Sequence, residues 1–502
     1  MEDNQNPAGK IGSDFFAKID STNEPSPAAE AVDSPPTPPT NIFTATPPPI
    51  ETGFPPSPVA EATVLSDLPP SEGRGKLKMI FLLVAAVLLL GGLAIFFISG
   101  RSSNKQPVKA KETTLIYWGL WEPEVIINEI VADYQKTHPK IKINYVFQSQ
   151  RDYRERLQSA LARGEGPDIF RFHNTWTAML KNDLAPVPAT VMDAGTFERI
   201  FYPVVRTDLR VGNSYYGIPL EIDNLALFYN EDIFATAGKT PPKTWDEFRK
   251  LALELTVKDN TGKIQTAGAA MGVTKNVDHW SDILALLLLQ NGADLSNPTN
   301  NLAEDALTFY TIFSRSDNIW DENLPASTYY FAIGRLAMYF APSWRIFEIK
   351  ALNPSLKFGV IPVPQLPGTG IGWATYWVEG VAKKSTHQEE SWEFLKFLST
   401  KETMQKLYQI QSSKRLFGEP YSRTDMADLL RKEPYVGVFI DQASKAKSWY
   451  LCSRTFDNGL NDKIIKYYED AVNSVNKGGD IKAALATAAR GIAQILTQYG
   501  AK

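Results

Sequence analysis

Cysteine is almost absent from this sequence, because Cys452 is the single one among 502 residues. One cysteine excludes an intrachain disulfide and every cysteine-rich metal site, so packing alone must stabilise the fold. Only four histidines occur, and none has the His-Glu-x-x-His spacing of zinc enzymes. These absences argue against a structural or catalytic metal.

The motifs of common enzyme classes are missing as well. The chain has no Walker loop, no Gly-x-Gly-x-x-Gly, no Gly-x-Ser-x-Gly and no Cys-x-x-Cys. We therefore expect a protein that is not an enzyme and that needs no cofactor.

Charge is unevenly distributed along the chain. Residues 1–75 contain 11 acidic and three basic residues, whereas residues 76–111 contain six basic and no acidic ones. From residue 112 onward, 43 basic and 45 acidic residues nearly balance. A near-neutral domain gives no basic surface of the kind that binds nucleic acid.

The first hundred residues divide into an arm and an apolar segment. Residues 1–75 are rich in proline and poor in large apolar side chains, which predicts a disordered, acidic arm. Residues 79–98 are all apolar or glycine, and a helix of this length spans about 30 Å, the thickness of a bilayer core. We predict a transmembrane signal-anchor helix within residues 76–100, followed by a linker over residues 101–111. A cleaved signal peptide is disfavoured because the segment begins far into the chain.

Strand-like and helix-like segments alternate beyond the linker. Strands are predicted over residues 114–119, 141–147 and 167–172, with helices over 124–138 and 153–163. This order indicates an α/β fold with a doubly wound sheet, which binds ligands at the carboxyl ends of its strands.

Helix signals further along the chain have structural interpretations. Thr244 and Glu247 have the spacing of a capping box, and Trp245 between them is expected to anchor the helix on the core. Residues 391–398 place large apolar side chains on one helical face, which is typical of a core-facing helix.

Four stretches then match a known family in the expected order. They are Gly-Glu-Gly-Pro-Asp-Ile-Phe at 164–170, Tyr-Gly-Ile-Pro-Leu at 216–220 followed by residues 225–234, Pro-Pro-Lys-Thr-Trp-Asp-Glu-Phe at 241–248, and residues 331–344, which end in Ala-Pro-Ser-Trp. Together they resemble family 1 of the extracellular solute-binding proteins of ABC transporters, the group that includes maltose-binding protein. The resemblance covers nearly all of residues 112 to about 400.

This resemblance implies a two-lobed periplasmic-binding-protein fold of type II with a hinge. The first lobe is expected at about 112–222 and 358–405, and the second at 223–357 and 406–502. A monomer would capture a small ligand, a sugar or oligosaccharide, by hinge closure and deliver it to two permease subunits with a cytoplasmic ATPase. Basic residues flank residues 79–98 on both sides, so charge leaves the topology open. The implied function places the protein in the cell membrane, with the binding domain outside and the N-terminus in the cytoplasm.

The resemblance also implies ligand contacts. The positions that match the family's contacts are Asn174, Thr175, Trp176, Asp223, Asp278, His279, Trp280 and Trp344. An indole such as Trp344 can cover the apolar face of a sugar, while Asp, Asn and His side chains bond its hydroxyls. The family's Asp-Arg pair is replaced here by Asn174 and Thr175, which puts a maltodextrin ligand in doubt.

Further candidates lie at strand ends or in late aromatic clusters. They are Glu122, Trp373, Tyr376, Trp449 and Tyr450. The alternative for each aromatic is a place in the core. Arg415 and Arg454 either pair with carboxylates or bind an acidic ligand.

Two other functions stay open at the sequence level. Glu122, Asp223 and Asp278 include possible carboxylate pairs for glycoside hydrolysis, which needs two carboxyl groups about 5–9 Å apart. A ligand-sensing receptor that signals through the N-terminal arm is the other alternative.

Overall fold

The computed structural model describes residues 112–501. The predicted arm, transmembrane helix and linker lie outside the described residues. Within residues 112–501, no helix is both long and apolar enough to cross a membrane.

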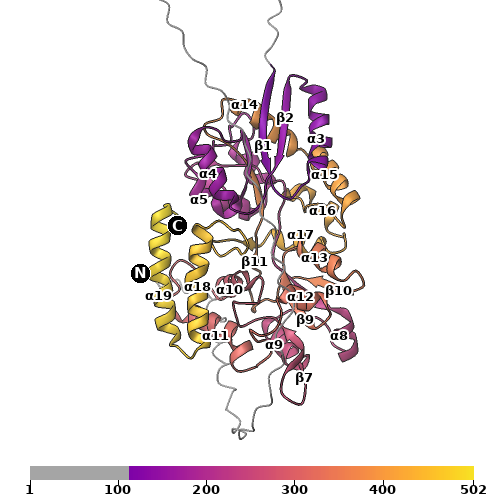
Figure 1. The fold of residues 1–502 in the computed structure, drawn as a ribbon, viewed down its shortest axis with the longest axis vertical. Helices are drawn as coiled ribbons and strands as arrows, with labels where there is room; N and C mark the ends of the chain where they lie inside the picture. Colours follow the sequence, from indigo (N-terminus) through magenta and orange to yellow (C-terminus); the bar gives the residue numbers. More distant parts are fainter. Residues whose placement is uncertain (1–111, 502) are drawn as a thin grey trace, which may run out of the picture. The chain divides into compact units, whose positions relative to one another are not determined.

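A four-stranded sheet forms the core of the first lobe (Figure 1). Its strand order is β12 (Trp377–Val381), β3 (Ile169–His173), β1 (Thr113–Gly119) and β2 (Ile141–Phe147). β1 pairs in parallel with β2 and β3, and β12 runs antiparallel to β3. The predicted strands are confirmed to within two residues.

Helices connect and cover this sheet. The predicted helices are confirmed as α3 (Glu124–Thr137) and α4 (Tyr153–Arg163). The remaining elements between β3 and the second sheet are η1 (Asn174–Trp176), α5 (Thr177–Leu180), α6 (Ala194–Ile200), α7 (Pro203–Asp208), β4 (Arg210–Val211) and β5 (Ser214–Tyr215).

A five-stranded sheet forms the second lobe. Its order is β10 (Phe358–Ile361), β6 (Ala226–Asn230), β9 (Leu336–Ala341), β8 (Ile264–Ala269) and β7 (Val257–Lys258). β9 is buried along its whole length, because helices cover the sheet. The helices of this lobe are α8 (Glu231–Ala237), α9 (Trp245–Glu254), α10 (Trp280–Gln290), α11 (Asn301–Arg315), α12 (Ser327–Ala332) and α13 (Arg345–Leu352).

Two expected lobe boundaries shift in the structure. β10 pairs antiparallel with β6, so residues 358–361 belong to the second sheet rather than to the first lobe. α15 (Lys401–Lys414) packs on α3, so the first lobe extends past residue 405. Both shifts come from pairing between segments that are far apart in the sequence.

The chain then returns across both lobes. The elements after β10 that have not yet been named are β11 (Gly372–Trp373), α14 (Gln388–Leu398), η2 (Thr424–Met426), α16 (Ala427–Leu430), α17 (Gly437–Ala443), β13 (Ala446–Lys447), α18 (Leu460–Asn476) and α19 (Ile481–Tyr499). α18 and α19 lie side by side and pack on α11 of the second lobe (Figure 1).

The two expected helix features are confirmed. Thr244 and Glu247 form a complete capping box at the start of α9, and the indole of Trp245 is buried and donates to Gln290 Oε1 at 2.7 Å. On α14, Trp392 and Leu395 are buried with Leu398 in the core.

Backbone hydrogen bonds join two distant stretches of the chain near the point where it crosses from one lobe to the other. Residues 219–224 lead from the first lobe into β6, and residues 419–422 run beside them; we call these two stretches the paired segments. Ile222 N–H donates to the carbonyl of Pro420 at 2.9 Å, and Glu221 bridges Tyr421 antiparallel. These contacts hold the entry into the second lobe against a segment that follows α15.

Candidate functional site

A cleft of about 480 Å³ lies at the ends of strands from both lobes. Its volume is in the range of sites for small ligands. The residues that line it are Trp121, Gln150, His173, Glu221, Asp223, Trp344, Arg345, Phe347, Glu348, Thr375, Trp377, Arg415, Glu419, Ser453, Arg454 and Phe456. β1, β3 and β9 all end close to lining residues, so the cleft lies at the carboxyl ends of these strands, as the fold predicts.

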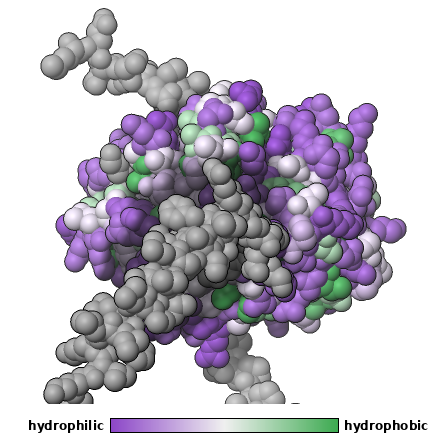
Figure 2. Space-filling model, turned by 90° about the horizontal axis from the view of Figure 1, so that it is seen from above, coloured by the Kyte–Doolittle hydropathy of each residue, from purple (hydrophilic) through white to green (hydrophobic). Residues whose placement is uncertain are grey.

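Exposed aromatic rings are concentrated in this cleft. Trp121 is 40% exposed, Trp344 38% and Phe456 45%. Trp121 also packs edge-on against Trp377, with 5.7 Å between ring centroids. Large aromatic side chains exposed together mark a binding surface. Elsewhere, on the face that Figure 2 shows, hydrophilic side chains predominate and the hydrophobic areas are small and separate.

Unusual backbone geometry also occurs in the cleft. Trp121, Arg454 and Phe456 have φ angles of 71°, 60° and 50°. The left-handed region costs energy for residues with a Cβ atom, and such residues cluster at functional sites. The three side chains are therefore held in the cleft at a cost to the backbone.

Trp344 lies between the end of β9 and the first residue of α13. The guanidinium of Arg345 lies 4.4 Å from the centre of the indole, and the ring of His279 meets it edge-on at 5.7 Å. These contacts fix the orientation of the ring while part of it stays exposed. Trp344, which the sequence predicts as a ligand contact, lines the cleft.

The arginines of the cleft are already paired with carboxylates. Arg345 forms ion pairs with Glu348 and, at 3.5 Å, with Asp278. Arg454 also pairs with Asp278, and Arg415 bonds Glu419 at 2.5 Å. Of the two roles expected for Arg415 and Arg454, the structure shows pairing with carboxylates.

Asp278 does not line the cleft, but it forms ion pairs with Arg345 and Arg454, which do. Burial acts to raise its pKa, but hydrogen bonds from Thr328 and the charge of Arg345 outweigh burial and hold the pKa well below the ordinary value. Thr328 Oγ1 donates to Asp278 Oδ2 at 2.6 Å. Asp278 is thus a fixed anion that positions Arg345 and Arg454.

Asp223 lines the cleft and is only 6% exposed. Its carboxylate accepts the N–H of Asn224 at 2.7 Å and the N–H and hydroxyl of Ser343 at 3.0 and 2.8 Å. Burial raises the pKa of Asp223 to about 7 and outweighs these donors, which act to lower it. Its charge at neutral pH is therefore easily changed.

His279 lies behind the cleft wall, where it orients Ser453. Arg345 Nε donates to His279 Nε2 at 3.0 Å, so the proton of the neutral ring is on Nδ1. Nδ1 lies 2.9 Å from the hydroxyl oxygen of Ser453 and donates to it. Burial lowers the pKa of His279, in agreement with a neutral ring.

The three residues that follow β3 are buried away from the cleft. Trp176 is 1% exposed and packs against Trp377. Asn174 Nδ2 donates to Asp208 at 2.8 Å, and Thr175 Oγ1 accepts from Asn461 at 2.7 Å. The polar groups of Asn174 and Thr175 are therefore bonded within the protein, whereas the indole N–H of Trp176 is buried without a hydrogen-bond partner among the described residues.

Six other predicted contacts are also absent from the cleft lining. Glu122 forms a buried ion pair with Arg171, Trp373 donates to Asp282, and the Tyr376 hydroxyl donates to Asp208. The remaining three are Trp280, which is buried at the start of α10, and Trp449 and Tyr450, which are half-buried and pack on each other. In the structure these five aromatic side chains pack in or against the core, and the carboxylate of Glu122 is used in an ion pair.

Several lining residues were missed at the sequence level. They are Trp121, Gln150, His173, Glu221, Arg345, Phe347, Glu348, Thr375, Trp377, Glu419, Ser453 and Phe456. Several of them neighbour a candidate in the sequence: for example, Trp121 precedes Glu122 at the end of a predicted strand, Trp377 follows Tyr376, and Ser453 precedes Arg454.

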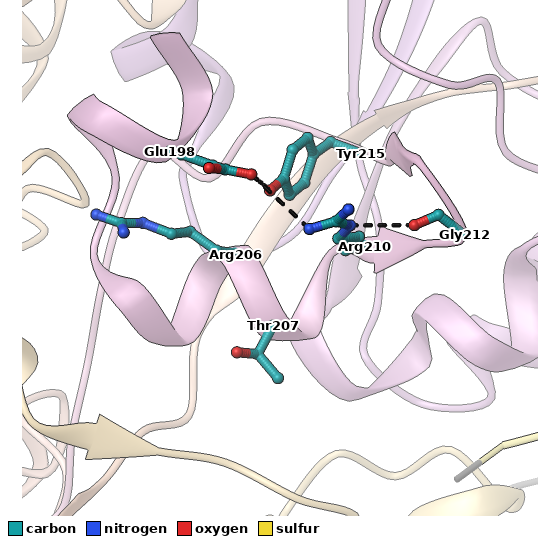
Figure 3. Close-up of a pocket in the computed structure, with 6 residues that line it drawn as sticks. All are labelled: Glu198, Arg206, Thr207, Arg210, Gly212 and Tyr215. Carbon is teal, nitrogen blue, oxygen red and sulfur yellow. Dashed lines mark hydrogen bonds and ion pairs between the residues drawn. The ribbon is translucent and has the colours of Figure 1, made fainter. Parts of the chain in front are cut away.

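A second hollow lies on the surface of the first lobe (Figure 3). Its residues are Glu198, Arg206, Thr207, Arg210, Gly212 and Tyr215. The Tyr215 hydroxyl donates to Glu198 at 2.6 Å, and Arg210 lies 3.8 Å from the same carboxylate. The hollow is open and shares no residue with the cleft, so we assign no site to it. Across residues 112–501, no three His, Cys, Asp or Glu side chains are placed to hold a metal ion.

Known proteins resemble the chain in sequence and in fold. An arabinooligosaccharide-binding protein of Bacillus subtilis is 27% identical over 390 residues, which is 70% of this chain and 84% of the relative. An sn-glycerol-3-phosphate-binding periplasmic protein of Pectobacterium atrosepticum is 26% identical, over 64% of this chain and 77% of the relative. The solved structure of a sugar-binding protein from Xanthomonas citri has the same fold, with a TM-score of 0.63 and 21% identity over 77% of this chain and 98% of that one.

Residues 121–405 match the family described as bacterial extracellular solute-binding protein. The match spans more than half of the chain and includes the whole second sheet, all strands of the first sheet except β1, and most of the cleft. The chain therefore belongs to the family of extracellular solute-binding proteins of ABC transporters that its sequence motifs indicate.

Proposed function

We propose that this protein captures a neutral sugar or oligosaccharide in the cleft between its lobes and presents it to an ABC importer. The observation that carries the proposal is the composition of the cleft: exposed indoles and a phenyl ring beside hydrogen-bonding groups whose charges are mostly paired. A sugar has apolar C–H faces that aromatic rings cover and hydroxyls that carboxylates and arginines bond.

The charges of the cleft favour a neutral ligand over an anion. Each of the three lining arginines has a carboxylate partner, so an anionic ligand would have to displace one. Asp223 and the ion-paired Glu348 and Glu419 add acidic groups, but no unpaired cation, to the lining. The sn-glycerol-3-phosphate relative keeps an anionic ligand as the competing candidate.

Catalysis is not part of this function. The family and the curated relatives are binding proteins of ABC transporters rather than enzymes, which sets aside the glycoside hydrolase alternative.

A screen by thermal unfolding tests the ligand class. The full chain is heated with neutral mono- and oligosaccharides, with sn-glycerol-3-phosphate and with amino acids. A ligand that binds only the folded state raises the unfolding midpoint by mass action. We expect at least one neutral sugar to raise it, and stabilisation by the phosphate ester alone would overturn the proposal.

Anchoring is the second part of the proposal. Residues 79–98 would hold the domain at the outer surface of the cell membrane, with the N-terminus in the cytoplasm and no need for a lipid. Deletion of residues 79–98 should release the protein from the membrane fraction, whereas deletion of residues 1–70 should not. The same 1–70 deletion tests the receptor alternative, because a transport component should still support uptake.

A further inference from the structure

Two acidic side chains in the cleft wall, Glu221 and Glu419, are hydrogen-bonded to each other. The carboxyl groups of Glu221 and Glu419 are in hydrogen-bond contact, and both line the cleft. Two ionised carboxylates have only acceptor oxygens, so a hydrogen bond between them requires a proton on one. The two residues belong to the paired segments, 219–224 and 419–422, which are also joined by backbone contacts.

The surroundings determine which carboxyl group keeps the proton. Arg415 Nη2 donates to Glu419 Oε1 at 2.5 Å, so Glu419 has a cation beside it. Glu221 is 7% exposed and accepts the backbone N–H of Trp377 at 3.0 Å, and no ion pair is formed by its carboxyl group in the described structure. The proton therefore belongs on Glu221, from which it is donated to Glu419.

The other charged groups near the pair are engaged elsewhere. Arg171 of β3 forms ion pairs with Glu122 at 2.6 Å and with Glu379 of β12 at 2.7 Å. Glu122 lies in the loop that follows β1. Asp223, on the same segment as Glu221, bonds Ser343. The remaining lining groups are His173, whose pKa burial lowers to about 3, and Arg345, Glu348 and Arg454, which are in the ion pairs described above.

We propose that Glu221 and Glu419 form an acid pair that retains one proton at neutral pH, and that this proton fastens the paired segments together in the cleft wall. Loss of the proton would leave two carboxylates in contact, with only Arg415 beside Glu419 to offset their charge. The resulting repulsion would push the paired segments apart. The effect of this proton on ligand binding rests on the function proposed above: once Glu221 has lost the proton, the cleft would bind a neutral ligand less tightly.

The pKa directions agree with this geometry. Burial, followed by the charge of Glu419, raises the pKa of Glu221 well above its ordinary value of 4.5. Burial also acts to raise the pKa of Glu419, but the charge of Arg415 and the hydrogen bonds outweigh it, and the pKa is lowered. The folded state thus keeps a proton that the unfolded state has lost. Stability should fall as the pH rises from about 4.5 through the raised pKa of Glu221.

Infrared difference spectroscopy of the ligand-free full chain tests the pair directly. At pH 7, Asp208 and Asp223, whose pKa values burial raises to about 6 and 7, are present in both wild type and variant, so their bands cancel in a difference spectrum. The difference between wild type and Glu221→Gln should still show the carbonyl band of a protonated carboxylic acid, which shifts in D2O. Absence of this band would overturn the proposal.

Two variants keep the result interpretable. Glu419→Gln replaces the carboxylate acceptor with a neutral amide oxygen, a weaker acceptor, and should shift the frequency of the band, so it serves if Glu221→Gln fails to fold; an unshifted band would contradict the pair. Glu129→Gln, on the exposed face of α3, is the matched control and should leave the spectrum unchanged.

Urea unfolding between pH 5 and 9 adds a second readout. Wild type should lose more stability than Glu221→Gln as the pH rises, because the glutamine amide keeps its donor at every pH. Equal slopes would contradict the proposal. Neither measurement uses a sugar, so failure of the sugar proposal would not affect them.

Discussion

Trp344 is one of three exposed aromatic rings on the proposed stacking surface. It is exposed, lines the cleft and is held in place by Arg345 and His279. Trp344→Ala should weaken binding of the sugar that stabilises the protein by about tenfold, since an aromatic contact contributes on the order of 1 kcal/mol beyond its burial.

Trp344→Phe keeps an aromatic face and should recover most of that affinity in calorimetric titration. Tyr329→Ala is the matched control, because Tyr329 is 47% exposed but does not line the cleft. Equal affinities of wild type and Trp344→Ala would show that the sugar does not stack on this ring.

His173 should make the stability of the protein depend on pH in the acid range. Its ring is buried, with Nδ1 2.8 Å from the hydroxyl of Thr175 and Nε2 3.0 Å from that of Thr375. Burial lowers its pKa from 6.5 to about 3. The unfolded chain takes up a proton near pH 6.5 that the folded protein refuses until about pH 3, so stability falls as the pH falls through this range.

His173→Gln should remove this part of the acid dependence, on the order of a few kcal/mol. Urea unfolding from pH 7 to pH 4 measures it. His387→Gln, outside the cleft, is the control and should keep the wild-type slope; an identical slope in His173→Gln would contradict the assignment.

At the scale of elements, β8 and α9 approach each other too closely for a side chain at Gly268. A Cβ atom there would lie 1.9 Å from the carbonyl oxygen of Ala252 on α9. Gly268→Ala should therefore force the helix away from the sheet and lower the free energy of unfolding by about 1–3 kcal/mol.

Gly195→Ala is the matched control for this substitution in urea unfolding. Gly195 lies in α6, and a Cβ atom there meets only a side-chain oxygen of Asp193 at 3.3 Å. It should change stability little or raise it slightly. If both variants unfold alike, the close packing of β8 on α9 is not a constraint.

Elements that local pattern defines were predictable from the sequence. β2 and α4 begin and end at the predicted residues, and the capping box of α9 is present. The position of β10 was not predictable, because it depends on pairing with β6, more than a hundred residues earlier.

The cleft was less predictable than the elements around it. The positive φ of Trp121 breaks the alternation of the strand before it, so periodicity gave no reason to prefer Trp121 over Glu122. Trp176 is buried by Trp377, which lies far along the chain. Ser453 and Phe456 lie in a segment without helix or strand, where no pattern indicates which side chains face a ligand.

At the scale of the whole molecule, the cleft draws on both lobes, so a ligand that contacts both stabilises a closed arrangement. X-ray scattering of the full chain should show a smaller radius of gyration with a saturating neutral sugar than without it. Trp344→Ala at the same sugar concentration should show less of the closed form. No change in wild type at saturation would contradict closure.

Calorimetric titration of the full chain measures whether a neutral sugar binds and whether the exposed aromatic rings of the cleft hold it. We predict saturable binding of one neutral sugar or oligosaccharide per chain, weakened in Trp344→Ala and stronger than any binding of sn-glycerol-3-phosphate. Binding of the phosphate ester without binding of any neutral sugar, or sugar binding that is indifferent to both Trp121→Ala and Trp344→Ala, would contradict it.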